Sequence, residues 1–206
     1  QLQQQKHKIP LFELFKKHTL TVLFIILYSM SGTIGFYFIT IYIPSYLHHL
    51  GFKTQNYLTI TLLGNAIIFI GTPICGLCIS YFNIIKAASV FLILYIILPI
   101  PLLVAVTYYK VNIYIIFLLY IPLLISFSLT NVVTTLLFPN KIRYTGVAFT
   151  GNLNVCLFGG TTPLICWYLT KITGWYLMPA IYFSSTAIIS LIALYLFKSK
   201  LTEMIH

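Results

Sequence analysis

The side chains best able to bind a ligand in this chain are polar residues that recur at helical spacing inside long apolar runs. Three stripes stand out: Ser29, Thr33, Tyr37 and Thr40; Ser128, Asn131 and Thr135; and Asn152, Cys156, Gly159 and Pro163. Residues three, four or seven positions apart share one face of a helix. In lipid such side chains need partners, so each stripe predicts a face turned into a helix bundle or a watery cavity. Hydrogen bonding that merely holds helices together is an equal alternative.

Patterns for catalysis or metal binding are missing. The sequence contains neither a phosphate-cradling glycine loop nor an H-E-x-x-H pair. Cys75 and Cys78 match C-x-x-C, but they lie in an apolar run, which favours packing over redox chemistry. His48 and His49 are adjacent, and neighbouring helical side chains point about 100° apart, which suits one shared metal poorly. We expect no enzyme activity, no cofactor and no metal site.

The composition predicts a membrane protein. Of the 206 residues, 60% are hydrophobic, and the only acids are Glu13 and Glu203. A soluble domain with so little charge would expose large apolar patches, so the lipid bilayer is the expected environment. The cations fall singly between apolar runs instead of clustering on one face, which argues against a nucleic-acid partner.

Six apolar runs are long enough to cross a bilayer, which takes about 20 residues. They cover residues 19–47, 57–82, 87–108, 113–138, 146–169 and 176–197. The predicted fold class is an all-α membrane protein with six transmembrane helices. Residues 1–18 are expected to form a basic cytoplasmic linker, 19–197 the bundle and 198–206 a cytoplasmic tail. Within the linker, residues 9–18 fit either a short amphipathic helix on the membrane surface or a continuation of the first span.

The distribution of cations predicts the orientation. One side of the spans would carry nine: Lys6, Lys8, Lys16, Lys17, Lys86, Lys141, Arg143, Lys198 and Lys200. The other side would carry three: Lys53, Lys110 and Lys171. Because basic loops stay in the cytoplasm, both termini are expected there.

The connection between the fourth and fifth spans is unusually rich in special residues. Pro139 cannot continue the helical ladder and should end span four. Lys141 and Arg143 should hold the turn among headgroups and water. Four glycines are then expected to let the fifth helix approach its neighbours closely: Gly146, Gly151, Gly159 and Gly160.

The same region carries a family resemblance. Its residues are Phe138-Pro139, Ile142 to Gly146, Asn152, Phe158-Gly159-Gly160 and Pro163-Leu164, followed by Thr173-Gly174 and Met178 to Tyr182. In these residues the chain resembles the C-terminal half of a major facilitator superfamily transporter, and more narrowly the proton symporters for proline and glycine betaine. The resemblance implies one half of a twelve-helix fold, with spans one and four lining the substrate cavity. It also implies a missing N-terminal six-helix half as partner, which fits a first residue of Gln.

One loop departs from the family pattern. The cytoplasmic gating loop of the superfamily usually reads G-x-x-x-D-[RK]-x-G. Counted from Gly76, this chain has Ser80, Tyr81 and Asn83 at the last three fixed positions and then Lys86. The charge pairs that latch the inward gate are therefore expected to be missing.

The resemblance implies proton-coupled uptake of a small zwitterionic osmolyte, such as proline or glycine betaine, by alternating access in the bacterial inner (plasma) membrane. Aromatic rings attract a quaternary ammonium, and hydrogen-bond donors can hold a carboxylate. The cavity candidates are Tyr28, Tyr37, Tyr42, Asn131, Thr135 and Asn152. The candidates for the cytoplasmic loop and gate are Lys86, Lys141 and Arg143.

No Asp, Glu, Lys or Arg lies at mid-membrane, so an acid that couples transport to protons is expected outside these residues.

Two further interpretations stay open. The chain could be a non-functional remnant of a split or truncated transporter gene. It could also be a six-span structural or assembly protein, in which case the polar stripes should pack against other helices instead of facing water.

Overall fold

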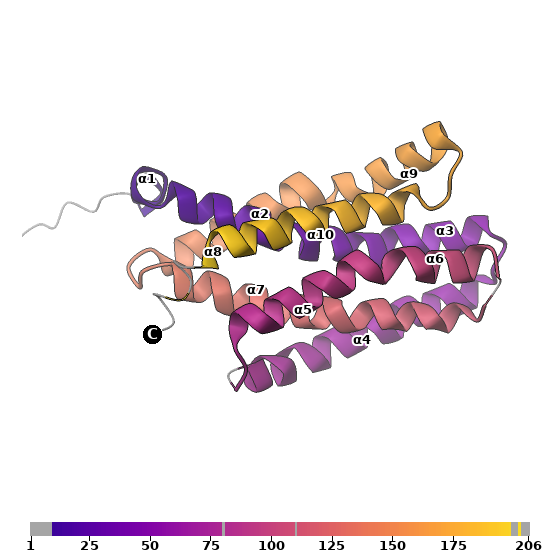
Figure 1. The fold of residues 1–206 in the computed structure, drawn as a ribbon, viewed down its shortest axis with the longest axis horizontal. Helices are drawn as coiled ribbons and strands as arrows, with labels where there is room; N and C mark the ends of the chain where they lie inside the picture. Colours follow the sequence, from indigo (N-terminus) through magenta and orange to yellow (C-terminus); the bar gives the residue numbers. More distant parts are fainter. Residues whose placement is uncertain (1–9, 80, 110, 199–201, 203–206) are drawn as a thin grey trace, which may run out of the picture.

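Long helices make up nearly all of the protein (Figure 1). The computed structural model describes residues 10–79, 81–109, 111–198 and 202. Within these ranges, six helical segments are long and apolar enough to cross a membrane, and we number them spans one to six. They are Thr19–His49, Thr54–Ile79, Ile84–Thr107, Ile113–Leu137, Arg143–Thr173 and Met178–Leu196. The chain is an all-α, multi-pass membrane protein, which confirms the predicted fold class.

The ends of the spans lie close to their predicted positions. The largest difference is at span five, which ends at Thr173 instead of residue 169. Gly174 follows it with a φ of 66°, a left-handed conformation that suits glycine, and its N–H bonds the Thr170 carbonyl. A glycine in this conformation is a common helix end.

A short helix precedes the first span. Helix α1 (Pro10–Lys17) is separated from α2 (Thr19–Tyr37) by His18, whose φ of −123° leaves the helical region. Figure 1 shows α1 almost end-on while α2 runs along the bundle. The Phe15 ring meets the Phe149 ring edge-on, with centroids 5.1 Å apart. Residues 10–17 therefore form a separate helix and do not continue span one.

Two of the spans contain a π-helical turn. Span one consists of α2, the π-helical η1 (Phe38–Tyr42) and α3 (Ile43–His49). Span five consists of α8 (Arg143–Asn154), the π-helical η3 (Val155–Gly159) and α9 (Thr161–Thr173). A π-helical turn bonds i to i+5 and so carries an extra residue, and such turns are frequent at functional sites.

The other spans are regular or broken by proline. Span two is α4 (Thr54–Ile79) and span six is α10 (Met178–Leu196). Span three divides into α5 (Ile84–Ile97) and α6 (Pro99–Thr107), where Pro99 lacks the N–H that would continue the ladder. Span four begins as a 3-10 helix, η2 (Ile113–Leu119), and continues as α7 (Tyr120–Leu137).

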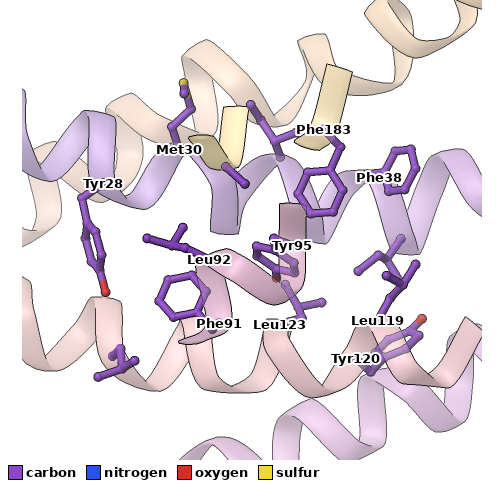
Figure 2. Packing of buried hydrophobic residues seen from close by; sticks show 14 of the residues in the cluster. Tyr28, Met30, Phe38, Phe91, Leu92, Tyr95, Leu119, Tyr120, Leu123 and Phe183 are labelled. Carbon is purple, nitrogen blue, oxygen red and sulfur yellow. The ribbon is translucent and has the colours of Figure 1, made fainter. Parts of the chain in front are cut away.

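The core lies where α2, α5, α7 and α10 pack together (Figure 2). The Phe183 ring of α10 meets the Tyr95 ring of α5 at 4.7 Å and the Phe38 ring of η1 at 5.1 Å. Gly35 makes this approach possible, because a Cβ there would lie 3.0 Å from both Phe183 and the Tyr95 hydroxyl. All three aromatic side chains are fully buried.

The outer spans leave broad faces uncovered. Of the residues in the most apolar stretch of each span, only 11% are buried in span two and 17% in span five, against 67% in span one. Helix α4 packs on α7 and exposes Leu62 and Phe69. Spans two and five therefore carry much of the surface that lipid or a partner must cover.

The turn between spans four and five forms as predicted at its start. Helix α7 ends at Leu137, and Phe138 is extended, as expected before Pro139. Arg143 donates from Nε to the Phe138 carbonyl at 3.2 Å. The Phe138 ring lies over Gly146, where a Cβ would come within 2.7 Å.

Two of the four glycines do not serve the purpose predicted for them. Gly151 and Gly160 are exposed, and a Cβ at either would meet nothing within 4 Å. The expectation that they allow close helix approach is therefore wrong for this six-span bundle. Both lie on the uncovered side of span five.

The described cations are distributed unevenly between the two ends of the bundle. The end with α1 and the start of α8 carries Lys16, Lys17, Lys86, Lys141, Arg143 and Lys198, whereas the end with α3 and α9 carries Lys53 and Lys171 (Figure 1). Lys6, Lys8, Lys110 and Lys200 lie outside the described residues. We call these the basic end and the aromatic end; which of them faces the cytoplasm stays a prediction.

Candidate functional site

The polar stripe of span one meets span five, and we call their contact the one–five seam. Near the basic end, Asn154 of α8 donates from Nδ2 to the Ser29 hydroxyl at 2.7 Å. Ser29 in turn donates to the Ile25 carbonyl at 2.6 Å. Both side chains are buried. This contact joins α2 to α8 inside the bundle.

At the middle of the seam an aromatic ring covers a glycine. A Cβ on Gly159 would lie 2.8 Å from the Tyr37 ring, so a larger side chain would displace that ring. Tyr37 directly precedes η1, and Gly159 is the last residue of η3. Both π-helical turns therefore adjoin this contact between the spans.

Toward the aromatic end the seam opens into a pocket. The Tyr42 hydroxyl and the Thr170 hydroxyl share a hydrogen bond of 3.2 Å between η1 and α9. Both residues line a cavity of about 480 Å³, together with Tyr46 and Trp167. Of the three tyrosines that the sequence singled out, Tyr42 is the one that lines this pocket.

Tyr28 lies elsewhere, in the aromatic core. Its ring stacks on Phe24 at 5.7 Å and meets Phe91 of α5 at 6.2 Å. The side chain is 1% exposed, and its hydroxyl has no hydrogen-bond partner. Figure 2 shows it among the core residues. The structure therefore does not bring Tyr28 together with Tyr37 and Tyr42.

The predicted stripe of span four is divided between two environments. Ser128 is buried and donates to the Thr72 carbonyl of α4 at 2.9 Å. Asn131 and Thr135 are exposed on α7, and the Thr135 hydroxyl donates to the Asn131 carbonyl at 2.7 Å. Ser128 holds helices together, while the other two are accessible from outside the bundle.

In span five the structure buries a different asparagine from the one that the sequence singled out. Asn152, the sequence candidate, is exposed on α8. Asn154, which the sequence analysis missed, is buried and bonded to Ser29. The signal for it was present: Gly146, Thr150 and Asn154 recur every four residues, and all three are buried.

The three basic candidates lie at the basic end. Lys86 and Lys141 are exposed, whereas Arg143 is half-buried against the Phe138 carbonyl. Asn83, which replaces a glycine of the gating motif, caps α5: its side-chain oxygen accepts from the N–H groups of Ile85 and Lys86, both at 3.1 Å. Ser80 lies outside the described residues.

A metal centre has no support among the residues that the structure describes. They contain no group of three or more His, Cys, Asp or Glu side chains that could hold a metal ion. The geometry instead provides six spans, a seam with polar contacts, and a pocket at one end of that seam. These features define a multi-pass membrane protein with a pocket between spans one and five.

Comparison with known proteins adds a specific likeness. Over 58 residues, which are 28% of its length, the chain is 43% identical to the ectoine/proline transporter ProP of Corynebacterium glutamicum. Over the same length it is 43% identical to a putative proline/betaine transporter of Staphylococcus haemolyticus. A putative proline/betaine transporter of Staphylococcus aureus is 38% identical over the same length. The chain resembles proline/betaine transporters in this segment.

The likeness covers only a small part of those relatives. The matched segment spans 12% of the length of each. No family model matches the chain. No solved structure matches it at a significant level.

Proposed function

We propose that this chain is the C-terminal six-helix half of a major facilitator superfamily transporter, which takes up a small zwitterionic osmolyte such as proline or glycine betaine together with protons. The observation that carries the proposal is the 43% identity over 58 residues to an ectoine/proline transporter. Six spans are half of a twelve-helix carrier, and the uncovered faces of spans two and five offer surface to a second half.

The accessible polar residues suit a cavity that is shared with that second half. Carriers of this kind hold the substrate between their repeats near the midplane. Asn131 and Thr135 on α7 would donate hydrogen bonds to a carboxylate, and Asn152 lies on the open side of span five. Tyr37 and Tyr42 would present rings to an ammonium group. Tyr28 would support α2 from the core.

Alternating access requires the spans to bend or rock. A π-helical turn interrupts the regular hydrogen-bond ladder locally. Across the one–five seam, η1 packs on α9 and η3 packs on α2. Bending at this level would move the pocket end of the seam relative to the Asn154–Ser29 contact. At the basic end, Lys86, Lys141 and Arg143 would pair with acids of the other half when the inward gate closes.

Orientation and proton coupling follow from the same reasoning. The excess of cations at the basic end supports a cytoplasmic position for that end and for both termini, in a bacterial inner membrane. Because no Asp, Glu, Lys or Arg lies in the middle of a span, the N-terminal half would supply the ionisable group that carries the proton.

Uptake by paired halves tests this function. The chain would be expressed with the first six spans of a proline/betaine transporter in bacteria that lack their own uptake of both compounds. We expect accumulation of labelled glycine betaine or proline only when both halves are present, and its loss on addition of a protonophore. Each half expressed alone is the control.

Two results would contradict the proposal. If both halves insert, co-purify and still accumulate neither compound, the chain fits a remnant without transport activity. If the chain instead co-purifies with unrelated membrane proteins through spans one and four, it fits an assembly protein.

A further inference from the structure

The pocket at the aromatic end has the size and position of a site for a small ligand. It encloses about 480 Å³ between η1, α3 and α9, with Tyr176 of the following loop at its edge. Ligand pockets in proteins usually measure about 300–1,000 Å³. A compact osmolyte would fit with room for bridging water.

The base of the pocket is made of two tyrosines with fixed hydroxyls. Tyr42 and Tyr46 are both buried, and their rings stack with centroids 5.9 Å apart. The Tyr42 hydroxyl is bonded to Thr170 and the Tyr46 hydroxyl to Thr107 of α6. Both rings are therefore held in place before any ligand arrives, which reduces the entropy lost on binding.

The rim of the pocket is aromatic and carries a cation. Trp167 and Tyr176 are about half exposed there, and Tyr176 lies 6.0 Å from the Tyr46 ring. The ammonium of Lys171 lies 4.9 Å from the centre of the Trp167 ring. This contact shows that the aromatic wall already accepts an ammonium group against its face.

The charge of the lining selects the ligand class. Among the described residues that line the pocket, Lys171 is the one Lys or Arg, His49 is the other basic residue, and there is no Asp or Glu. A ligand that is only a cation would be repelled by Lys171 and would find no acid to pair with. A carboxylate would pair with Lys171, while an ammonium on the same molecule could lie against the tyrosine rings.

We propose that this pocket binds small zwitterions that carry both a carboxylate and an ammonium group, with Lys171 holding the carboxylate and the tyrosine rings holding the ammonium. This inference rests on the proposed function and adds a second binding site for the same substrate. The site lies at the end of the one–five seam opposite Lys86, Lys141 and Arg143. If the basic end is cytoplasmic, the pocket opens on the outer side and captures the substrate before it enters the cavity.

The protein carries its own probe for this site. Its only tryptophans are Trp167, on the rim, and Trp175, which does not line the pocket. Trp175→Phe therefore leaves a single fluorophore at the proposed site. The full chain would be purified in a maltoside detergent, which has no ammonium group, and titrated with glycine betaine, proline and choline, both alone and joined to its partner half.

We expect a saturable change in Trp167 fluorescence with glycine betaine and proline, and none at the same concentrations of choline. Lys171→Gln should weaken betaine binding about tenfold or more, because it removes a charged hydrogen bond, and Lys171→Arg should restore most of it. Lys53→Gln, at the same end but outside the pocket, is the matched control and should bind as the parent does. Circular dichroism would verify that each variant is folded.

Several outcomes would overturn the inference. They are binding of choline as tight as that of betaine, betaine binding unchanged in Lys171→Gln, and no fluorescence change in either the single chain or the paired halves. Displacement of betaine by added zwitterionic lipid would instead identify a lipid headgroup site. Transport without binding at Trp167 rejects this site alone, whereas binding without transport rejects the proposed function alone.

Discussion

Span one has two unlike sides: one packs into the aromatic core and the other forms the one–five seam. Toward α5 and α10 it presents buried aromatic rings, such as Tyr28 and Phe38, that pack against Phe91 and Phe183 (Figure 2). Toward span five it presents polar groups and a ring above a glycine. The second side ends in a pocket.

This difference separates stability from binding within a single helix. In lipid, helices associate through close packing and a few hydrogen bonds, since the surrounding tails are as apolar as the side chains. The core side uses interlocked rings, which are costly to disturb. The seam uses isolated hydrogen bonds and two π-helical turns, which are easier to rearrange. We therefore expect the seam to move while the core holds.

The largest expected effect is on the core side. Phe183→Ala should lower the free energy of unfolding by about 3 kcal/mol, because it leaves a cavity beside Tyr95 and Phe38. The measurement is unfolding by SDS in mixed micelles. Ile188→Ala, at an exposed position of the same helix, should change stability by less than about 1 kcal/mol. Equal losses for the two variants would show that no packed core exists here.

The middle of the seam is tested by two adjacent glycines. Gly159→Ala should destabilise by about 1–3 kcal/mol, because its Cβ would press on the Tyr37 ring. Gly160→Ala, with open space around its Cβ, should stay within about 0.5 kcal/mol of the parent. In the double variant Gly159→Ala/Tyr37→Leu part of the loss should return. Indistinguishable melting of the two alanine variants would argue against the seam contact.

The buried polar contact should contribute less. In a double-mutant cycle, Asn154→Ala and Ser29→Ala should show a coupling of about 0.6 kcal/mol and at most about 1.7 kcal/mol, the average and maximum for hydrogen bonds between membrane helices. The matched cycle of Asn152→Ala with Ser29→Ala should show no coupling, because Asn152 is exposed. Coupling at Asn152 and none at Asn154 would restore the sequence-based choice.

The smallest effect is expected at the pocket. Tyr42→Phe removes the hydroxyl that bonds Thr170 and should cost about 0.5 kcal/mol of unfolding free energy. Thr170→Val should cost a similar amount, and the double variant should cost no more than either alone. Fully additive losses would show that the two hydroxyls do not interact.

The sequence predicted the spans well because their signal is simply the length of an apolar run. It predicted the end of span four at Pro139 because proline lacks the N–H that would continue the helical hydrogen bonds. It also found the stripe Ser29–Tyr37, since α2 is a regular helix up to Tyr37 and its 3.6-residue period holds. These predictions depend on local chemistry alone.

The site residues of span five were harder to predict for a physical reason. The line from Asn152 to Pro163 assumes one continuous α-helix, but η3 inserts a π-helical turn between them and shifts the phase of every residue beyond it. No residue type marks such a turn. The hydrogen-bond partner of a polar side chain also depends on tertiary packing. Only the packing of α8 on α2 shows that Asn154, and not Asn152, contacts Ser29.

Thiol labelling directly tests whether the chain crosses the membrane six times with the basic end in the cytoplasm. In a background with all four native cysteines changed to serine, Lys53→Cys and Lys141→Cys would be treated with a membrane-impermeant reagent on intact cells. We expect labelling of Lys53→Cys at once and of Lys141→Cys only after the membrane is opened. Labelling of Lys141→Cys in intact cells, or recovery of the chain in the soluble fraction, would contradict it.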